Sequence, residues 1–273
     1  MESGGERRAC GLGAGANFVS VARFKRADAA MMNEVELSVV LPAYEEAESL
    51  RQILPALKEL VGRLTSRFEV LVVDTREPRD DTPQLCQQLG VTYVPRRGGD
   101  LYGDAVRTGL VTARGDWIAM MDADGSHNPR ALAALWQHRQ NYDLVVASRY
   151  VHGGQTENPA ILIFMSHMVN IVFRLALRLK CYDVSNSFRL YRGADVRALH
   201  LECDHFDVVE EILVKLADSR PNFRIKEVPF TFEKRKAGKT KRRLVMFILG
   251  YLGTLGRLWR LKAKAKRERK RAT

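Results

Sequence analysis

The stretch Leu37-Ser-Val-Val-Leu-Pro42 predicts a short buried β-strand, because it is apolar and β-branched and ends at a proline. Residues 45–64 follow with the periodicity of an amphipathic helix. Such alternation predicts an α/β fold in which a mostly parallel sheet is covered by helices on both faces. The pattern repeats, with strands expected at residues 68–73, 91–94, 117–121 and 144–148 and helices at residues 82–89, 103–113 and 129–140.

The chain is long enough to bury one substantial core. It has 273 residues, of which 46% are apolar, and this suits a single large domain with short appendages. The four cysteines are far apart and form no Cys-x-x-Cys pair, so neither a zinc site nor a disulfide framework is expected. Residues 1–34 lack a compact apolar stretch and are expected to be a disordered leader, with Met31 or Met32 as an alternative start.

The positive charge of the protein is concentrated at one end. The formal net charge is +12, but residues 234–273 carry 16 Lys and Arg against one Glu, whereas the preceding residues carry 28 Lys and Arg against 31 Asp and Glu. Basicity is therefore a property of the tail, and the body is close to neutral. We divide the chain into a main domain at residues 35–241 and a basic segment at residues 242–273.

Polar residues gather where the expected strands end. Tyr44 and Glu46 follow the first strand, Asp74 ends the second, and Asp122 and Asp124 follow the fourth. Ligands of a largely parallel sheet bind outside the carboxyl ends of its strands. Two carboxylates two residues apart on an extended segment point to the same side, where they can share a hard divalent cation with a diphosphate. The sequence therefore predicts a Mg²⁺ or Mn²⁺ site at this edge of the sheet.

Several motifs in order carry a resemblance to a known family. The chain resembles family 2 glycosyltransferases with the GT-A (Rossmann-like) fold, and within them the dolichyl-phosphate and polyprenyl-phosphate mannosyltransferases. The resemblance implies an enzyme that moves a hexose, with mannose carried on GDP as the expected donor, onto a polyprenyl or dolichyl phosphate. The motifs are Leu41-Pro-Ala-Tyr-Glu-Glu46, Met121-Asp-Ala-Asp-Gly-Ser-His-Asn-Pro129, Ser148-Arg-Tyr-Val-His-Gly-Gly154, Ser187-Phe-Arg-Leu-Tyr191, which is expected to lead into a helix, and Arg235-Lys-Ala-Gly-Lys-Thr-Lys241.

The resemblance also implies roles for single residues. Catalysis is expected to depend on Asp124, Arg149 and Arg235. Because a lipid phosphate is already ionised at neutral pH, the implied mechanism is a single in-line displacement without a general base, which relies on positioning and charge neutralisation. The implied sets are Pro42, Tyr44, Glu46, Asp74 and Asp122 for the donor nucleotide, Asp122, Asp124 and Ser126 for the metal, and Arg149, Ser166, Arg235 and Lys241 for the acceptor phosphate.

Three positions depart from the family pattern. Thr75 stands where a second acidic residue is usual, and Ser187 stands where a glycine is usual. Leu162 stands four positions before Ser166, where a basic residue is expected. These departures bear on the choice of donor and acceptor and not on the fold.

The chain is expected to attach to a membrane without spanning it. No run reaches the roughly 18 to 20 apolar residues that a spanning helix needs. Residues 244–261 place apolar side chains at helical spacing between basic residues, which predicts an amphipathic helix in the membrane interface, and the basic residues after it would bind anionic headgroups. A second apolar helix at residues 161–179 is expected to line the lipid's approach, with a buried core helix as the alternative. The expected location is the cytoplasmic face of a membrane.

Other functions are kept as alternatives. A transferase acting on a saccharide or soluble acceptor needs a base, for which Asp183, Glu210, Glu211 and His205 are the candidates. A non-enzymatic protein whose basic tail binds membranes or nucleic acid is of a different class. Nucleic acid is not an expected partner, because the tail follows an amphipathic helix rather than stacking aromatic residues. A dinucleotide-dependent oxidoreductase is disfavoured, since no Gly-x-Gly-x-x-Gly follows the first strand.

Overall fold

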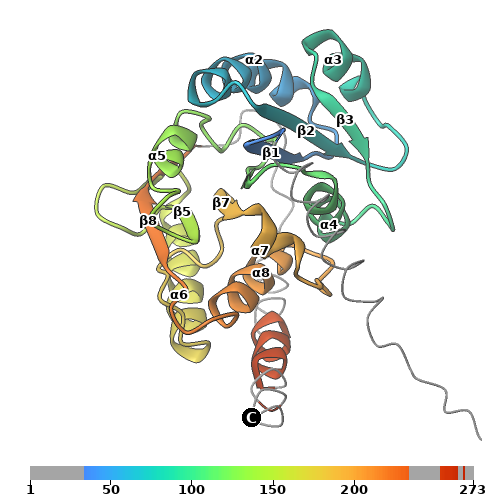
Figure 1. The fold of residues 1–273 in the computed structure, drawn as a ribbon. Coiled ribbons are helices and arrows are strands. Elements are labelled where there is room, and N and C mark those ends of the chain that lie inside the picture. Colours follow the sequence, from blue (N-terminus) through green and yellow to red (C-terminus); the bar gives the residue numbers. More distant parts are fainter. Residues whose placement is uncertain (1–33, 234–252, 264–266, 268–273) are drawn as a thin grey trace, which may run out of the picture.

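The computed structural model describes residues 34–233, 253–263 and 267 and is built on one seven-stranded sheet (Figure 1). The strand order is β3-β2-β1-β4-β7-β5-β8. The strands are β1 (Leu37–Pro42), β2 (Phe68–Asp74), β3 (Thr92–Pro95), β4 (Trp117–Met120), β5 (Leu144–Ser148), β7 (Arg189–Arg192) and β8 (Ile225–Pro229), and a separate parallel pair is formed by β6 (Gln155–Thr156) and β9 (Thr231–Phe232).

Helices cover both faces of this sheet, as Figure 1 shows. The alternation of the strands decides which side chain meets which layer: Val39 and Leu41 face one layer and Val40 faces the other, and all three are fully buried. The α/β prediction is confirmed. One layer contains α2 (Ala47–Leu64), α3 (Thr82–Leu89) and α5 (Ala131–Gln137), and the other contains α4 (Tyr102–Thr112), α7 (Gly193–Arg197), α8 (Val208–Ala217) and the helix at residues 253–263, here named the C-terminal helix.

Strand β7 is the one antiparallel strand of the seven-stranded sheet. It lies between β4 and β5 and pairs antiparallel with both, whereas the other neighbouring pairs are parallel. Residues 187–191, expected to lead into a helix, contain most of β7, whose Leu190 and Tyr191 face opposite sides of the sheet, and α7 follows at Gly193. Since β7 runs against its neighbours, the segment before it lies at the carboxyl edge of β4 and β5.

Helix α6 (Ala160–Ala176) is exposed along most of its length. Among its residues only Asn170 and Phe173 are buried, while Ile161, Phe164 and Leu175 are each at least 60% exposed. The alternative of a buried core helix is therefore wrong for this segment. Within the described ranges, the structure contains no helix of sufficient length and apolar character to cross a bilayer.

The C-terminal helix packs on the protein. Leu258 is fully buried in the same core layer as α8, and Leu255 packs against that layer. The Arg257 guanidinium lies 3.2 Å from the Asp207 carboxylate, and Lys262 Nζ donates to the Leu177 carbonyl at 2.5 Å. The prediction that these apolar residues lie among acyl chains is wrong for Leu255 and Leu258, because they complete the core. The leader at residues 1–33, and residues 234–252 with Arg235 and Lys241, fall outside the described residues.

Candidate functional site

The loop after β4 gathers oxygen ligands. Ser126 donates to Asp124 Oδ1 through its backbone nitrogen at 3.0 Å and through its hydroxyl at 2.5 Å. Gly125, with a φ of 81°, makes the left-handed turn that brings the two side chains together. Asp124 is nearly buried and Ser126 is fully buried. The loop is thus held in one conformation by its own hydrogen bonds.

Asp122 lies beside this turn and is more accessible, with 21% of its side chain exposed. Its Oδ1 accepts hydrogen bonds from the Tyr102 hydroxyl at 3.1 Å and from the Ser187 hydroxyl at 2.9 Å. Tyr102 comes from the first turn of α4 and Ser187 from the segment before β7. Three parts of the chain that are distant in sequence therefore meet at one carboxylate.

His127 completes the loop and was given no role by the sequence. It is buried, stacks on Phe188 at 5.1 Å between ring centroids, and meets Phe230 and Phe232 edge-on. Burial lowers the pKa of His127, which keeps the imidazole neutral. Its Nδ1 accepts the Asp122 backbone N–H at 2.9 Å, so the ring proton sits on Nε2, 3.8 Å from Asp122 Oδ2. The only sequence signal for this role is a histidine inside the loop motif.

These residues fit a hard divalent cation. Two carboxylates and a hydroxyl are the oxygen ligands that Mg²⁺ and Mn²⁺ prefer. Within the part of the chain that the structure describes, no group of three or more His, Cys, Asp or Glu side chains is placed to hold a metal. A cation at Asp122 and Asp124 would therefore take its further ligands from Ser126, from water or from a diphosphate.

The end of β2 presents a second polar site. Asp74 is buried, and its Oδ2 has no hydrogen-bond partner among the described residues. Burial raises the pKa of Asp74. The neighbouring Arg96 is also buried and donates to the carbonyls of Ala43, Asp100 and Leu101, which ties the ends of β1 and β3 together. Arg96 had no motif to reveal it, because its partners are backbone carbonyls of other loops.

Three expected donor residues lie near the end of β1. Pro42 is the last residue of that strand and is buried. Tyr44 is exposed, and its hydroxyl accepts from Arg79 Nη1 at 2.8 Å while the guanidinium lies 5.1 Å from the ring centroid. Glu46 precedes α2 and accepts from the Ser49 hydroxyl at 3.1 Å. The structure thus brings these residues to the same sheet edge as Asp74, as expected from the strand order.

Arg149 follows β5 and is held by a carboxylate. Its Nε and Nη2 donate to the two oxygens of Asp183 at 2.8 and 2.7 Å, and its Nη2 also donates to the Ser185 hydroxyl at 2.9 Å. Only 9% of the Arg149 side chain and none of the Asp183 side chain is exposed. The pair fixes the plane of the guanidinium and compensates most of its charge.

Ser166 is linked to this pair through α6. Its hydroxyl accepts from the Tyr150 hydroxyl at 2.7 Å, and its carbonyl accepts from Asn170 Nδ2 at 2.7 Å. Asn170 Oδ1 in turn accepts the backbone N–H groups of Val184 and Ser185. The structure therefore brings Ser166 and Arg149 into one hydrogen-bond network.

The carboxylates considered as general bases are engaged elsewhere. Glu211 accepts the backbone N–H groups of Glu202 and Cys203 and pairs with Lys215 at 2.7 Å. Asp183 is the partner of Arg149, and Glu210 is fully enclosed in the core. His205 is exposed on the loop before α8. None of the three carboxylates is both accessible and unengaged, which disfavours a mechanism that deprotonates a hydroxyl with one of them.

Glu210 gives a stability prediction with a definite pH dependence. Burial raises its pKa from 4.5 to about 8, so the folded protein keeps a proton that the unfolded chain releases. The free energy of unfolding should therefore fall as the pH rises from about 4.5 to about 8, by on the order of 2 kcal/mol or more. Glu210→Gln should remove this dependence and be more stable than the wild type at pH 8, as measured by urea unfolding.

The neighbouring Glu211 is the matched control. Its pKa is lowered, since hydrogen bonds from Lys215, Cys203 and Glu202 outweigh its desolvation. Glu211→Gln should therefore destabilise the protein at every pH above the unfolded pKa, with that loss shrinking only under acid conditions. A stability difference between wild type and Glu210→Gln that is the same at pH 5 and pH 8 would contradict the assignment.

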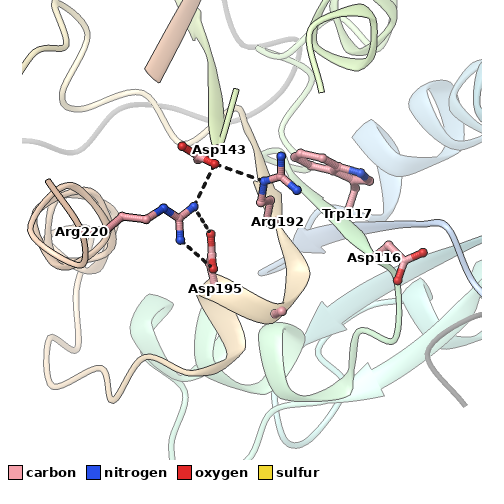
Figure 2. Close-up of a pocket in the computed structure, with 7 residues that line it drawn as sticks. Asp116, Trp117, Asp143, Arg192, Asp195 and Arg220 are labelled. Carbon is pink, nitrogen blue, oxygen red and sulfur yellow. Dashed lines mark hydrogen bonds and ion pairs between the residues drawn. The ribbon is translucent and has the colours of Figure 1, made fainter. Parts of the chain in front are cut away.

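A depression at the opposite edge of the sheet has a different character (Figure 2). Asp143 forms ion pairs with Arg220 and Arg192, with N–O distances of 2.8 and 3.3 Å. Arg220 also forms an ion pair with Asp195 at 2.9 Å. Arg192 lies over the Trp117 ring, 4.9 Å from its centroid. Because its arginines are matched by carboxylates, we assign this cluster to stabilising the start of β4 and β5 and not to substrate binding.

Comparison with known proteins agrees with this geometry. Residues 38–199 match the family described as glycosyl transferase family 2. A dolichol-phosphate mannosyltransferase of Pyrococcus furiosus is 33% identical over 216 residues, which are 76% of this chain and 59% of that protein. An undecaprenyl-phosphate mannosyltransferase of Micrococcus luteus is 32% identical over 217 residues, which are 74% of this chain and 85% of that protein. The chain thus spans less than two thirds of the length of the first of these relatives.

Solved structures show the same fold at lower identity. Glucosyl-3-phosphoglycerate synthase of Mycobacterium tuberculosis, in complex with phosphoglyceric acid, superimposes with a TM-score of 0.63 at 18% identity, covering 83% of this chain and 82% of that chain. Its complex with Mn²⁺ and UDP-glucose gives a TM-score of 0.61 at 17% identity, covering 85% and 83%. With an α/β sheet of this topology, an Asp-x-Asp loop at its carboxyl edge and a family match over more than half its length, this chain belongs to glycosyl transferase family 2.

Proposed function

We propose that this chain transfers a hexose from a nucleotide-sugar to a polyprenyl or dolichyl phosphate by a metal-assisted single displacement, with GDP-mannose as the expected donor. The proposal rests on the clustered oxygens of Asp122, Asp124 and Ser126. Ser187 belongs to the segment that binds Arg149, and its hydroxyl donates a hydrogen bond to Asp122. The two mannosyltransferase relatives, named for dolichol phosphate and undecaprenyl phosphate, support this acceptor class.

The donor half of the site is proposed at the ends of β1, β2 and β4. Asp74 Oδ2, buried without a partner among the described residues, is suited to accept an N–H group of the nucleobase. Pro42, Tyr44 and Glu46 line the same edge. An N–H donor from the ligand would satisfy that oxygen and so remove the cost of leaving it unpaired.

Asp122, Asp124 and Ser126 are proposed to hold the cation. A bound Mg²⁺ or Mn²⁺ supplies charge neutralisation for the departing nucleoside diphosphate. Structures of the family neighbour from Mycobacterium tuberculosis with Mn²⁺ and UDP-glucose, or with Mg²⁺ and UDP, support a divalent cation in this fold. The chain's own contribution is to fix both carboxylates before the donor arrives.

The acceptor half is proposed around Arg149 and Ser166. Asp183 sets the orientation of the Arg149 guanidinium but compensates most of its charge. A phosphate dianion would therefore draw its net attraction from further cations, for which Arg235 and Lys241 are proposed. With the phosphate held there, one of its oxygens attacks the anomeric carbon while the bond from that carbon to the diphosphate breaks.

Two features support attachment to the cytoplasmic face of a membrane. Helix α6, which carries Ser166, exposes Ile161, Phe164, Met168 and Leu175. Residues 257–273 carry nine Lys and Arg against one Glu. Arg257 and Lys262 contact Asp207 and the Leu177 carbonyl, and the other positive charges are proposed to attract anionic headgroups, at about 1 kcal/mol each near the surface. We propose that α6 faces the lipid and that the tail adds electrostatic attraction.

The proposal is tested by transfer of label into an organic phase. Purified protein is incubated with labelled GDP-mannose, UDP-glucose or other nucleotide-sugars, a short polyprenyl phosphate, and Mn²⁺ or Mg²⁺. We expect extractable label that requires both the metal and the lipid phosphate. Label transferred only to saccharides or other soluble acceptors would overturn the acceptor assignment, and no transfer from any donor would overturn the enzyme assignment.

A further inference from the structure

The Asp122 carboxylate is held by two hydroxyl groups that belong to other parts of the chain. The Tyr102 and Ser187 hydroxyls both donate to Oδ1, at 3.1 and 2.9 Å, and not to Oδ2. A single carboxylate oxygen with two donors has its torsion angle fixed, since rotation would break both bonds at once. The second oxygen is left facing the side of the loop that carries His127 Nε2, 3.8 Å away.

Each of these hydroxyls is itself held in place. The Tyr102 ring stacks on Phe206 with centroids 4.3 Å apart and an interplanar angle of 20°. The next residue, Gly103, donates its backbone N–H to the Asp204 carbonyl at 2.7 Å, which anchors the start of α4 to the loop before α8. The Tyr102 side chain therefore has no freedom to leave Asp122 without breaking the aromatic pair.

Ser187 is fixed from the other side. Its neighbour Asn186 donates through Nδ2 to the Ala147 carbonyl at 2.6 Å, and its neighbour Phe188 stacks on His127. Ser187 itself is only 5% exposed. Both hydroxyls thus act from rigid supports, which is the arrangement that orients a metal-binding carboxylate.

We infer that Tyr102 and Ser187 are positioning residues that orient Asp122 for the divalent cation. The inference rests on the proposed function, because it assigns these hydroxyls to the metal site of that reaction. Neither residue touches substrate in this assignment. Their removal should weaken the metal's contribution to donor binding while leaving the metal-independent part of donor binding unchanged.

The test separates these two parts by calorimetry. The dissociation constants of GDP and of UDP are measured with and without Mn²⁺ for the wild type, Tyr102→Phe, Ser187→Ala and the double variant. Loss of supporting partners around a metal ligand typically costs 10- to 100-fold in metal affinity. We expect the Mn²⁺-dependent gain in nucleotide affinity to fall about 3-fold in each single variant and about 10-fold in the double variant, on that scale.

The substitutions are chosen to keep the fold. Phenylalanine keeps the ring that stacks on Phe206, and alanine removes one oxygen at Ser187. Tyr142→Phe and Ser219→Ala are the controls, because each removes one hydroxyl group away from the site. Tyr142 contacts His138, and Ser219 donates to the Leu216 carbonyl, so these variants should keep the Mn²⁺-dependent gain in nucleotide affinity. The metal-free dissociation constants and melting temperatures report whether each variant is folded.

Three outcomes decide the question. An unchanged or larger Mn²⁺-dependent gain in the folded double variant overturns the positioning role while leaving the proposed function standing. A fall in metal-free nucleotide binding of the same size also overturns it, because the hydroxyls would then serve the nucleotide site in general. A wild-type protein with no metal-dependent gain for either nucleotide overturns both the inference and the metal assignment.

Discussion

Asp124→Asn is expected to lower the rate of sugar transfer by about 100- to 1,000-fold, the scale on which a buried electrostatic contribution to a transition state acts. The amide has the shape of the carboxylate and can still accept from Ser126, so the loop should keep its conformation. What would be lost is one negative charge beside the proposed cation, which would neutralise the leaving diphosphate. Initial rates of transfer at saturating donor, with the metal concentration varied, measure the effect.

Asp195→Asn is the control for this substitution. It removes the same charge at the opposite edge of the sheet, where Asp195 pairs with Arg220. Its transfer rate should stay within about 2-fold of the wild type, because a partly exposed ion pair contributes at most about 1 kcal/mol and that to stability. An Asp124→Asn protein that is folded and retains more than a tenth of the wild-type rate would contradict the assignment of Asp124.

Gly103→Ala is expected to destabilise the protein by about 3 kcal/mol or more, which is at the upper end for overpacking. A Cβ at this position would collide with the Cys203 carbonyl and lie 2.7 Å from Asp204 Cα. Both are backbone atoms, so the helix and the loop must separate. The same movement pulls Tyr102 away from Asp122, and metal-dependent nucleotide binding should weaken together with stability.

The comparison for this substitution is Gly256→Ala in the C-terminal helix. There the nearest atom to a new Cβ is at 4.0 Å, on the flexible side chain of Arg260. Alanine favours a helix over glycine by up to about 1 kcal/mol, so Gly256→Ala should be neutral or stabilising in urea unfolding. Equal stability of Gly103→Ala and wild type would show that α4 is not tightly apposed to the loop before α8.

Much of the fold follows from local sequence patterns. Strands β1, β2 and β4 were predictable because each belongs to a short apolar run that ends at a proline or an aspartate, namely Pro42, Asp74 and Asp122. Their carboxyl ends then place Asp122 and Asp124 at the sheet edge without further information. Strand β7 was missed, since a four-residue strand in an antiparallel position has no local signal to distinguish it from the start of a helix.

The supporting residues of the site were beyond sequence reasoning for a different reason. Each of these residues contacts Asp122 from elsewhere in the sequence: Tyr102 is 20 positions away, Ser187 is 65 and His127 is 5. Nothing in the neighbourhood of a tyrosine predicts a partner in another element. The amphipathic pattern at residues 244–261 likewise predicts an apolar helix face but not its partner, and Leu258 proves to meet the protein core.

The short segment from Asp183 to Ser187 serves two neighbours at once: its first residue binds Arg149, and its last binds Asp122. A change at either end is transmitted along five residues of chain to the other. In the proposed reaction, substitutions on the donor side and substitutions on the acceptor side should therefore not combine independently. A double-mutant cycle across Arg149 and Asp122 should show a coupling energy of about 1 kcal/mol or more, well above the few tenths of a kcal/mol typical of separate sites. Laboratory evolution of the proposed donor specificity should therefore also change the proposed acceptor specificity.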